Sequence, residues 1–188
     1  MKRIVIFASG SGSNAENLIK FFHNRENASV ILVLTNNPHA KVLDRAKKLK
    51  VSALSFNKIA FTETDDVLDL LKSAKPDLIV LAGFLWKFPE HILKQFPNKV
   101  INIHPALLPK YGGKGMYGMH VHDAIVANKE TETGITIHYV NEHYDEGAII
   151  FQSKCAVYDT DSAQDVANKI HELEMEHFPK VVDDVLND

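Results

Sequence analysis

The sequence predicts an α/β protein with a doubly wound, mostly parallel sheet and an antiparallel strand pair at its C-terminal end. Three observations predict this fold. Short runs of β-branched apolar residues alternate with segments of helical period, the first run leads through a glycine-rich turn into a helix, and the last two runs are joined by a polar turn. With 188 residues, the chain is expected to form a single domain, residues 1–188.

The parallel part of the sheet is expected before residue 105. Arg3–Ser9 is a near-continuous apolar run, typical of a strand buried on both faces, and Asn14–Phe22 has apolar residues at helical spacing. Further strands are expected at Val30–Leu34, Ala53–Phe56, Leu78–Ala82 and Val100–His104. Helices are expected between them, one with Val42, Ala46 and Leu49 on one face, one with Val67, Leu70, Leu71 and Ala74 that ends before Pro76, and a short one near Glu90–Gln95.

The pattern changes after His104. Pro109–Met119 holds four of the nine glycines, which predicts a mobile loop before a helix at about His120–Asn128. The expected antiparallel pair is Thr133–Val140 with Ile149–Val157, and the chain from Ser162 is expected to be helical.

Composition excludes several classes of protein. The net charge of −3 is spread along the chain without basic blocks, so a nucleic-acid partner is not expected. No apolar run reaches the ~18 residues of a membrane span, and the N-terminus lacks the apolar core of a signal peptide. The single cysteine, Cys155, is expected to be buried and inert. These features predict a cytoplasmic protein without a membrane partner.

The turn after the first strand is a candidate phosphate site. Ser11, Gly12, Ser13 and Asn14 lie between strand and helix, where free backbone N–H groups and the positive end of a helix can bind an anion. A dinucleotide site is not favoured, because Ala15 replaces the third glycine of that fingerprint and no acidic residue ends the next strand. An ordinary strand-to-helix turn is the alternative.

Asn102 and His104 are candidate catalytic residues. Side chains at i and i+2 share one face of a strand, and Pro105 keeps His104 extended at the carboxyl edge, where open α/β sheets bind ligands. A carboxamide beside an imidazole suits oxyanion stabilisation with proton transfer. Two polar groups capping a strand end are the alternative. Asp145, in the turn Asn141–Gly147, is a candidate partner of the imidazole, although for Asp145 alone a solvated turn is the better explanation.

The ten histidines raise the question of a metal site. His120, His122 and Asp123, with His104, His138 and His143, lack an evident set of three ligands at metal-binding spacing, and no cysteine pair assists. No metal is therefore expected. The remaining histidines are expected on the surface or on helix faces, and they are His23, His39, His91, His171 and His177.

Four motifs in order resemble the phosphoribosylglycinamide formyltransferases, a family of folate-dependent formyltransferases. They are Ser9–Asn14, Leu81–Phe84, Asn102–Tyr111 and Asp145–Gly147, and the match runs from residue 3 to the last helix. The resemblance implies a Rossmann-like formyltransferase fold, with a phosphate-binding half at about residues 1–100 and a catalytic and folate-binding half at about residues 101–188.

The resemblance also implies a reaction and a set of sites. A formyl group would pass from 10-formyltetrahydrofolate, as cosubstrate, to the primary amine of glycinamide ribonucleotide, in de novo purine biosynthesis. Ser11–Asn14 would bind the phosphate and Glu174 the ribose, while Asn102, His104 and Asp145 match the catalytic trio. The residues implied to line the folate pocket are Leu85, Trp86, Phe88, Asn141, Tyr144 and Asp145. A protonated His104 and the Asn102 amide would stabilise the tetrahedral oxyanion, and Asp145 would favour the imidazolium.

Two departures from the family pattern stand out. The family often has a basic, phosphate-supporting residue within the region of Thr62–Asp66, which is acidic here, so that either Lys169 or Lys114 substitutes for it or the affinity for the phosphate is lower. The loop Gly112–Met119 is longer than in many members. A monomer or weak homodimer is expected.

Other functions compete with this interpretation. Methionyl-tRNA formyltransferase and formyltetrahydrofolate deformylase share the Asn-x-His and Asp signature, but each would need a further domain for which 188 residues leave no room. A stand-alone hydrolase of formyl-folate is the enzymatic alternative. A non-catalytic nucleotide- or folate-binding module and a metal-dependent hydrolase built on the histidines are alternatives of other classes.

Overall fold

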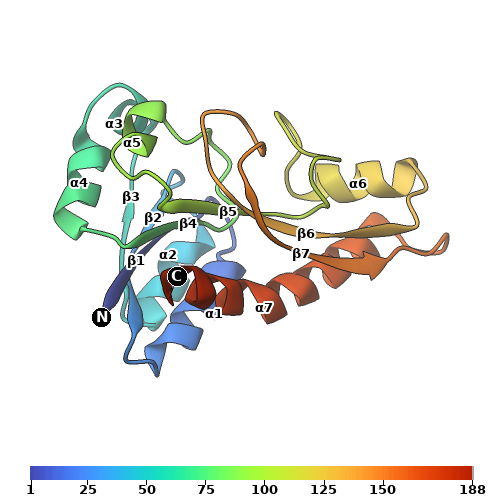
Figure 1. The fold of residues 1–188 in the computed structure, drawn as a ribbon, viewed down its shortest axis with the longest axis horizontal. Helices are drawn as coiled ribbons and strands as arrows, with labels where there is room; N and C mark the ends of the chain where they lie inside the picture. Colours follow the sequence, from blue (N-terminus) through green and yellow to red (C-terminus); the bar gives the residue numbers. More distant parts are fainter. Residues whose placement is uncertain (188) are drawn as a thin grey trace.

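The computed structural model describes residues 1–187 and contains one seven-stranded sheet in the order β3-β2-β1-β4-β5-β6-β7. Helices cover both faces of this sheet (Figure 1). The α/β class and the mostly parallel, doubly wound sheet predicted from the sequence are confirmed.

The five N-terminal strands run parallel to one another. They are β1 (Lys2–Phe7), β2 (Ala28–Thr35), β3 (Ser52–Ser55), β4 (Leu78–Leu81) and β5 (Val100–His104). Strand β1 lies between β2 and β4, so the strand order reverses beside it, and ligands of open α/β sheets bind at such a reversal. Leu81 pairs with Phe7 on one side and with Asn102 on the other, which places the ends of β1, β4 and β5 at one level.

The last two strands, β6 (Glu132–Tyr139) and β7 (Ile149–Ala156), form the predicted antiparallel pair, and β6 also runs antiparallel to β5. In this register, Asn102 pairs with His138 and His104 pairs with Thr136. Strand β6 ends beside the start of β5, because Tyr139 pairs with Ile101, and the turn that follows it folds back so that its Asp145 reaches His104 at the end of β5.

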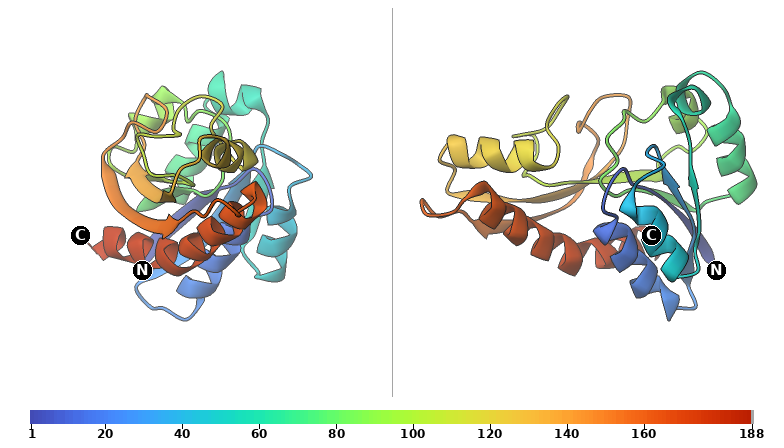
Figure 2. Two further views of the ribbon diagram at one scale, coloured as in Figure 1. Left: turned by 90° about the vertical axis from the view of Figure 1, so that its right-hand side faces the viewer. Right: turned by 180° about the vertical axis from the view of Figure 1, so that it is seen from behind.

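Two layers of helices sandwich the parallel strands, as the views from the side and from behind show (Figure 2). The helices α1 (Ser13–His23), α2 (Lys41–Lys48) and α7 (Ala163–Asn187) pack on one face, and α3 (Lys58–Thr62), α4 (Asp66–Ala74) and α5 (Glu90–Leu93) pack on the other. Along β1, Ile4 and Ile6 join one core while Val5 and Phe7 join the other, so this strand is buried on both faces, as its apolar run predicts.

The long helix α7 links the two halves of the chain. It packs against α1 as well as against β6, β7 and α6 (Met119–Ala127). Pro179 lies inside this helix and is itself buried. This packing brings Glu174 next to the turn after β1. No helix within residues 1–187 combines the length and the apolar character needed to cross a membrane.

Candidate active site

A cavity of about 590 Å³ opens at the carboxyl edge of the sheet, a volume within the range of small-molecule sites. It is lined by the turns that follow β1 and β4, by the end of β5, by one face of α7 and by the Gly112–Gly118 loop. The candidate phosphate residues Ser11–Asn14 and the candidate catalytic residues Asn102, His104 and Asp145 all line this one cavity. The structure therefore brings together residues that are more than 130 positions apart in the sequence.

The turn after β1 leaves helical N–H groups open to the cavity. Gly12 is the N-cap of α1 and has a φ of 74°, so its conformation favours glycine, and no side chain caps the helix. A Cβ at Gly12 would collide with Val42, whereas a Cβ at Gly10 would meet nothing within 4 Å. The first turn of an uncapped helix offers N–H groups suited to a phosphate.

Asn14 and Glu174 connect this turn to α7. The Asn14 amide donates from Nδ2 to Glu174 Oε2 at 2.9 Å. The buried Oδ1 of Asn14 has no hydrogen-bond partner within residues 1–187, and Asn14 lines the cavity. A buried acceptor without a partner is rare in folded proteins, and a ligand that donates a hydrogen bond would satisfy it.

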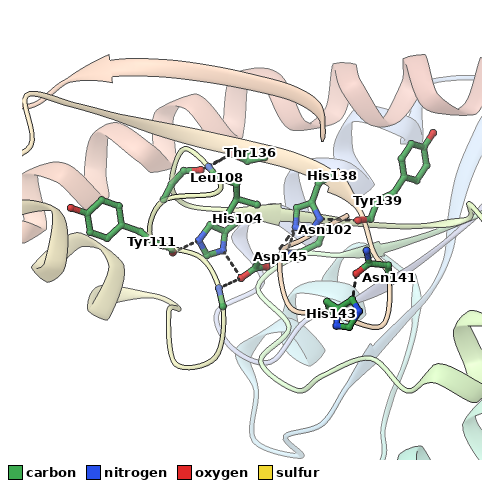
Figure 3. A network of polar contacts seen from close by, with 12 residues as sticks. Asn102, His104, Leu108, Tyr111, Thr136, His138, Tyr139, Asn141, His143 and Asp145 are labelled. Atoms are coloured by element: carbon green, nitrogen blue, oxygen red, sulfur yellow. Dashed lines mark hydrogen bonds and ion pairs between the residues drawn. The ribbon is translucent and has the colours of Figure 1, made fainter. Parts of the chain in front are cut away.

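Asn102 and His104 share one face of β5, as predicted, and a polar network surrounds them (Figure 3). His138 Nδ1 lies 2.8 Å from the Tyr139 carbonyl oxygen, which can only accept, so Nδ1 carries a proton. Its Nε2 lies 3.1 Å from Asn102 Nδ2 and accepts an amide N–H from it. In the described part of the chain, the side chain of Asn102 makes no other hydrogen bond, so its second Nδ2–H and its Oδ1 remain for a ligand.

His104 is buried and is contacted from both sides. Its Nε2–H donates to the carbonyl oxygen of Tyr111 at 2.7 Å, while its Nδ1 lies 3.7 Å from Asp145 Oδ2 (Figure 3). Tyr111 and Asp145 both have a φ of 56°, a left-handed conformation that is uncommon for residues other than glycine. Backbone strain of this kind clusters at functional sites.

Asp145 lies between the two imidazoles. Oδ2 accepts the Gly113 N–H at 2.9 Å, and Oδ1 lies 3.6 Å from His138 Nε2. Burial raises the pKa of Asp145, but the nearby imidazoles of His138 and His104 and the Gly113 N–H outweigh it, so the pKa falls below its ordinary value. Asp145 is therefore a carboxylate at neutral pH.

The charge of His104 differs from the sequence-based expectation. Burial lowers the pKa of His104, and attraction to Asp145 offsets this effect only in part. The resting imidazole is therefore neutral at pH 7 rather than protonated, with its proton on Nε2 and its Nδ1 lone pair toward Asp145. The expectation differs because the sequence indicates the acidic neighbour of His104 but does not show how deeply β5 is buried, and burial lowers the pKa of the imidazole.

The residues implied for folate divide between two neighbouring cavities. Leu85 lines the large cavity, and Tyr144 and Asp145 line both. A smaller cavity of about 70 Å³ lies behind Asn102, and it is lined by Trp86, Phe88, Asn141 and His138, among others. Phe88 is also a core residue, 3% exposed, whose ring packs edge-on against Phe7 and Phe61.

The structure separates the two lysines that could support a phosphate. Lys114 lines the cavity from the Gly112–Gly118 loop. Lys169 is not part of its lining, because its ammonium group is held by Asp161 at 2.5 Å and by the Ala156 carbonyl. Thr62–Asp66 is also absent from the cavity. Of these candidates, Lys114 alone could reach a ligand there.

His122 lines the cavity, and burial lowers its pKa. Its Nδ1 is buried and has no hydrogen-bond partner in the described part of the chain. In residues 1–187, no three His, Cys, Asp or Glu side chains are grouped so that they could hold a metal ion. Cys155, expected to be buried, is half-buried, and burial raises its thiol pKa.

Sequence reasoning missed three groups in this site. The sequence suggests His138 only as a metal ligand, and it gives no indication of the Tyr111 carbonyl or the Gly113 N–H. The strand pattern around His138 could have shown that it shares a sheet face with Asn102. The two backbone groups leave no signal in the sequence, because any residue supplies them.

The fold and the site define a class of protein. The chain matches the formyl transferase family over residues 2–182, and it belongs to that family.

Particular members of the family bear the name phosphoribosylglycinamide formyltransferase. The protein of that name from Haemophilus influenzae is 36% identical over 187 residues, covering 97% of this chain and 86% of that protein. The one from Bacillus subtilis is 32% identical, covering 99% and 95%. The chloroplastic one from Arabidopsis thaliana is 34% identical, and this chain spans 64% of its length.

Solved structures give the same result. The crystal structure of phosphoribosylglycinamide formyltransferase from Anaplasma phagocytophilum has a TM-score of 0.90 and 29% identity, covering 100% of this chain and 88% of that one. Glycinamide ribonucleotide transformylase 1 from Geobacillus kaustophilus has a TM-score of 0.88 and 32% identity, covering 99% of both chains.

Proposed function

We propose that this protein transfers the formyl group of 10-formyltetrahydrofolate to the primary amine of glycinamide ribonucleotide. The products are formylglycinamide ribonucleotide and tetrahydrofolate, in de novo purine biosynthesis. The observation that carries the proposal is the convergence of Asn102, His104 and Asp145 on a cavity whose wall also includes an uncapped helix N-terminus. The names of the relatives support the same reaction.

The ribonucleotide fits the part of the cavity between the turn after β1 and α7. Its phosphate would accept hydrogen bonds from the backbone N–H groups of Ser11–Asn14, and the ribose hydroxyls would donate hydrogen bonds to Glu174. The hydrogen bond from Asn14 fixes Oε2 of Glu174, so the sugar and phosphate subsites are held at a set separation. The glycinamide amine would then point toward Asn102 and His104.

The folate donor fits the second half of the site. Its flat ring would enter beside the Asn141–Asp145 turn, between Leu85, Trp86 and Tyr144, next to Phe88. The present volume of about 70 Å³ lies below the range for ligand cavities, so ring entry requires movement of the turn or of the aromatic side chains. The formyl carbon would lie in front of Asn102.

The reaction joins the amine nitrogen to the formyl carbon and breaks the bond from that carbon to the folate nitrogen. A glycinamide amine resembles an α-amino group, with a reference pKa of about 7.7–8.0, so about a tenth is neutral at pH 7. Attack turns the carbonyl oxygen into an oxyanion, to which the free Asn102 Nδ2–H donates.

Neutral His104 then accepts a proton at Nδ1 from the nitrogen that has attacked. Asp145 stabilises the imidazolium so formed, because its Oδ2 lies 3.7 Å from Nδ1. The same proton passes to the departing folate nitrogen, which leaves as a neutral amine. His104 is thereby restored to its resting state, and the reaction consumes no net proton.

We propose further that the protein acts in the cytoplasm, as a monomer or weak homodimer, without a metal, nucleic-acid or membrane partner. The net charge of −3 and the single folded unit expected for 188 residues support this view.

The test is a spectroscopic assay that follows loss of the formyl group from a formyl-folate analogue. We expect release only when glycinamide ribonucleotide is present, with the formylated ribonucleotide as product. Release without the amine would instead identify a hydrolase. Binding of both ligands without turnover would identify a binding module, and loss of activity on adding a chelator would identify a metal-dependent enzyme.

A further inference from the structure

The segment Pro105–Gly113, which follows β5, carries two main-chain groups of the site. The carbonyl oxygen of Tyr111 accepts a hydrogen bond from His104 Nε2 at 2.7 Å, and the Gly113 N–H donates to Asp145 at 2.9 Å. A main-chain group lies wherever the backbone lies. The orientation of both catalytic side chains therefore depends on what holds this segment in place.

Thr136, on β6, holds the segment through its hydroxyl group. The residue is fully buried, with 0% of its surface exposed. Its Oγ1 donates to the Ala106 carbonyl oxygen at 2.7 Å and accepts the Leu108 N–H at 3.0 Å (Figure 3). It accepts a third hydrogen bond from Nε2 of Gln152 at 2.9 Å. A hydroxyl has one proton to donate and two lone pairs, so the whole hydrogen-bonding capacity of Thr136 is used here.

Gln152, on β7, contributes a further hydrogen bond to the segment. Its Nε2 also donates to the Leu108 carbonyl oxygen at 3.1 Å, and because a carbonyl oxygen can only accept, the nitrogen of the amide must face it. His104 pairs with Thr136, and Thr136 pairs with Gln152, so the three residues form one row across β5, β6 and β7. Paired residues share a face of the sheet. Thr136 and Gln152 therefore reach the segment from the same side of the sheet as His104.

Leu108 transmits this hold to the end of the segment. Both of its backbone groups are bonded to the two side chains, and the residue is 6% exposed. A Cβ at Gly112 would lie 2.6 Å from Leu108 Cδ2 and 3.3 Å from Asp145 Cβ, so the backbone of Gly112 packs directly against both residues. Since Gly112 lies between Tyr111 and Gly113, a shift of Leu108 would move both main-chain groups of the site.

We propose that Thr136 and Gln152 form a clamp that positions His104 for proton transfer, because they fix the backbone that carries the Tyr111 carbonyl. This inference rests on the proposed function, which makes His104 the proton acceptor. With its proton held on Nε2 by the carbonyl, His104 keeps the lone pair of Nδ1 on the side of Asp145. If the carbonyl moved, the proton could pass to Nδ1, and Nδ1 could then no longer accept a proton from the attacking nitrogen. The two clamp residues touch no reacting atom, so they are positioning residues.

The first measurement is NMR of the imidazole N–H protons in protein with isotope-labelled histidine, without ligands, at pH 8. His104 is neutral there, because burial lowers its pKa below the ordinary value. In the unmodified protein we expect one proton on Nε2 of His104 and one on Nδ1 of His138, each protected by its carbonyl partner. His138 is the internal control, since its partner, the Tyr139 carbonyl, is not part of the clamped segment.

Three variants test the clamp by this signal and by turnover. Thr136→Val keeps the shape of the side chain but removes the hydroxyl. We expect the proton signal of His104 Nε2 to be lost or divided between the two nitrogens, that of His138 to be unchanged, and kcat to fall about 10- to 100-fold with little change in the KM for the ribonucleotide. Thr136→Ser restores the hydroxyl and should restore both readouts. Gln152→Met keeps the length but removes the donors, and it should give a smaller loss of the same kind.

The matched control is Thr133→Val, which makes the same exchange on the same strand. Thr133 is also buried, at 2% exposed, but its hydroxyl has no part in the clamp. We expect kcat and both proton signals to remain those of the unmodified protein. A change as large as in Thr136→Val would show that the loss of any buried hydroxyl on β6 has this effect, and it would refute the clamp.

Two further results would also overturn the inference. One is an unchanged His104 signal in Thr136→Val, whether or not kcat falls. The other is a simultaneous change of the His104 and His138 signals in both Thr136→Val and Gln152→Met, which would indicate a general disturbance of the sheet. The NMR signals do not depend on turnover. If they follow the clamp as expected but the unmodified protein transfers no formyl group, the proposed reaction fails and the positioning of His104 stands.

Discussion

The Nδ2 atom of Asn102 lies 3.1 Å from Nε2 of His138, on the neighbouring antiparallel strand. Because His138 Nδ1 donates to the Tyr139 carbonyl, Nε2 can only accept from Asn102, and this sets which side of the amide is nitrogen. The second Nδ2–H is thereby aimed by a residue that touches no reacting atom. His138 is a positioning residue for the proposed oxyanion donor.

Removing His138 should therefore act through Asn102. We expect His138→Ala to lower kcat about 10- to 100-fold with little change in the KM for the ribonucleotide. Asn102→Ala, which removes the oxyanion donor itself, should lower kcat about 10²- to 10³-fold. A double-mutant cycle checks the coupling, because the double variant should be no slower than Asn102→Ala alone. Losses that simply multiply would show that His138 acts independently of Asn102.

Asp145→Asn tests the stabilisation of the imidazolium. The amide is nearly isosteric and keeps an oxygen for the Gly113 N–H, but it removes the negative charge beside His104. We expect kcat to fall by about 10²–10⁴, the usual contribution of acid–base catalysis. Binding of ribose 5-phosphate should be unchanged in the same variant, and near-full turnover would refute the role of the carboxylate.

Stability should depend on pH through His104. Its pKa is lower in the folded protein than the ordinary 6.5, so the unfolded chain binds more protons between these two values. The contribution of neutral His104 to the free energy of unfolding is therefore fully present above pH 6.5, and it is lost as the pH falls through the pKa of the folded protein. Urea unfolding at pH 8, 6 and 5 should show this decline.

His104→Asn should make that decline shallower without abolishing it, because His122 also has a pKa lowered by burial. An exposed histidine offers the control, and His23→Asn should leave the profile unchanged. An equally steep decline in His104→Asn would mean that other groups govern it.

The phosphate turn can be tested by a pair of glycine substitutions. Gly12→Ala should destabilise the protein by about 1–2 kcal/mol or more, because φ is 74° there and the added Cβ meets Val42. Gly10→Ala should be near neutral, since its Cβ meets nothing within 4 Å. Denaturant unfolding of the two variants gives the comparison, and equal stabilities would contradict the described packing.

Most of the fold could be predicted because the buried strands are continuous apolar runs. The predicted strand Val100–His104 has the same bounds as β5, and the predicted bounds of the antiparallel pair agree with β6 and β7 to within one residue at each end. The five-residue helix Lys58–Thr62 was missed, because it is too short for a period to show. Asn57 caps the N-terminus of this helix, because its side chain accepts a hydrogen bond from the Ala60 N–H, and the burial of Phe61 stabilises the helix against the sheet.

Some features of the candidate site can likewise be predicted from the sequence, and others cannot. The shared face of Asn102 and His104 follows from strand geometry alone, and the approach of Asp145 depended on the family resemblance. The charge state of His104 depends on burial by segments distant in sequence, and the contact of Glu174 with Asn14 depends on the packing of α7 against α1. Neither can be obtained from local pattern.

The hydrogen bond from His104 to Tyr111 uses a main-chain carbonyl. Any side chain at position 111 that tolerates the φ of 56° leaves this acceptor in place, so the imidazole's orientation depends on the backbone there more than on the identity of the residue. An inserted or deleted residue between positions 104 and 111 would move the carbonyl itself. Over evolutionary time, the spacing of this segment should therefore be more constrained than the identity of its residues.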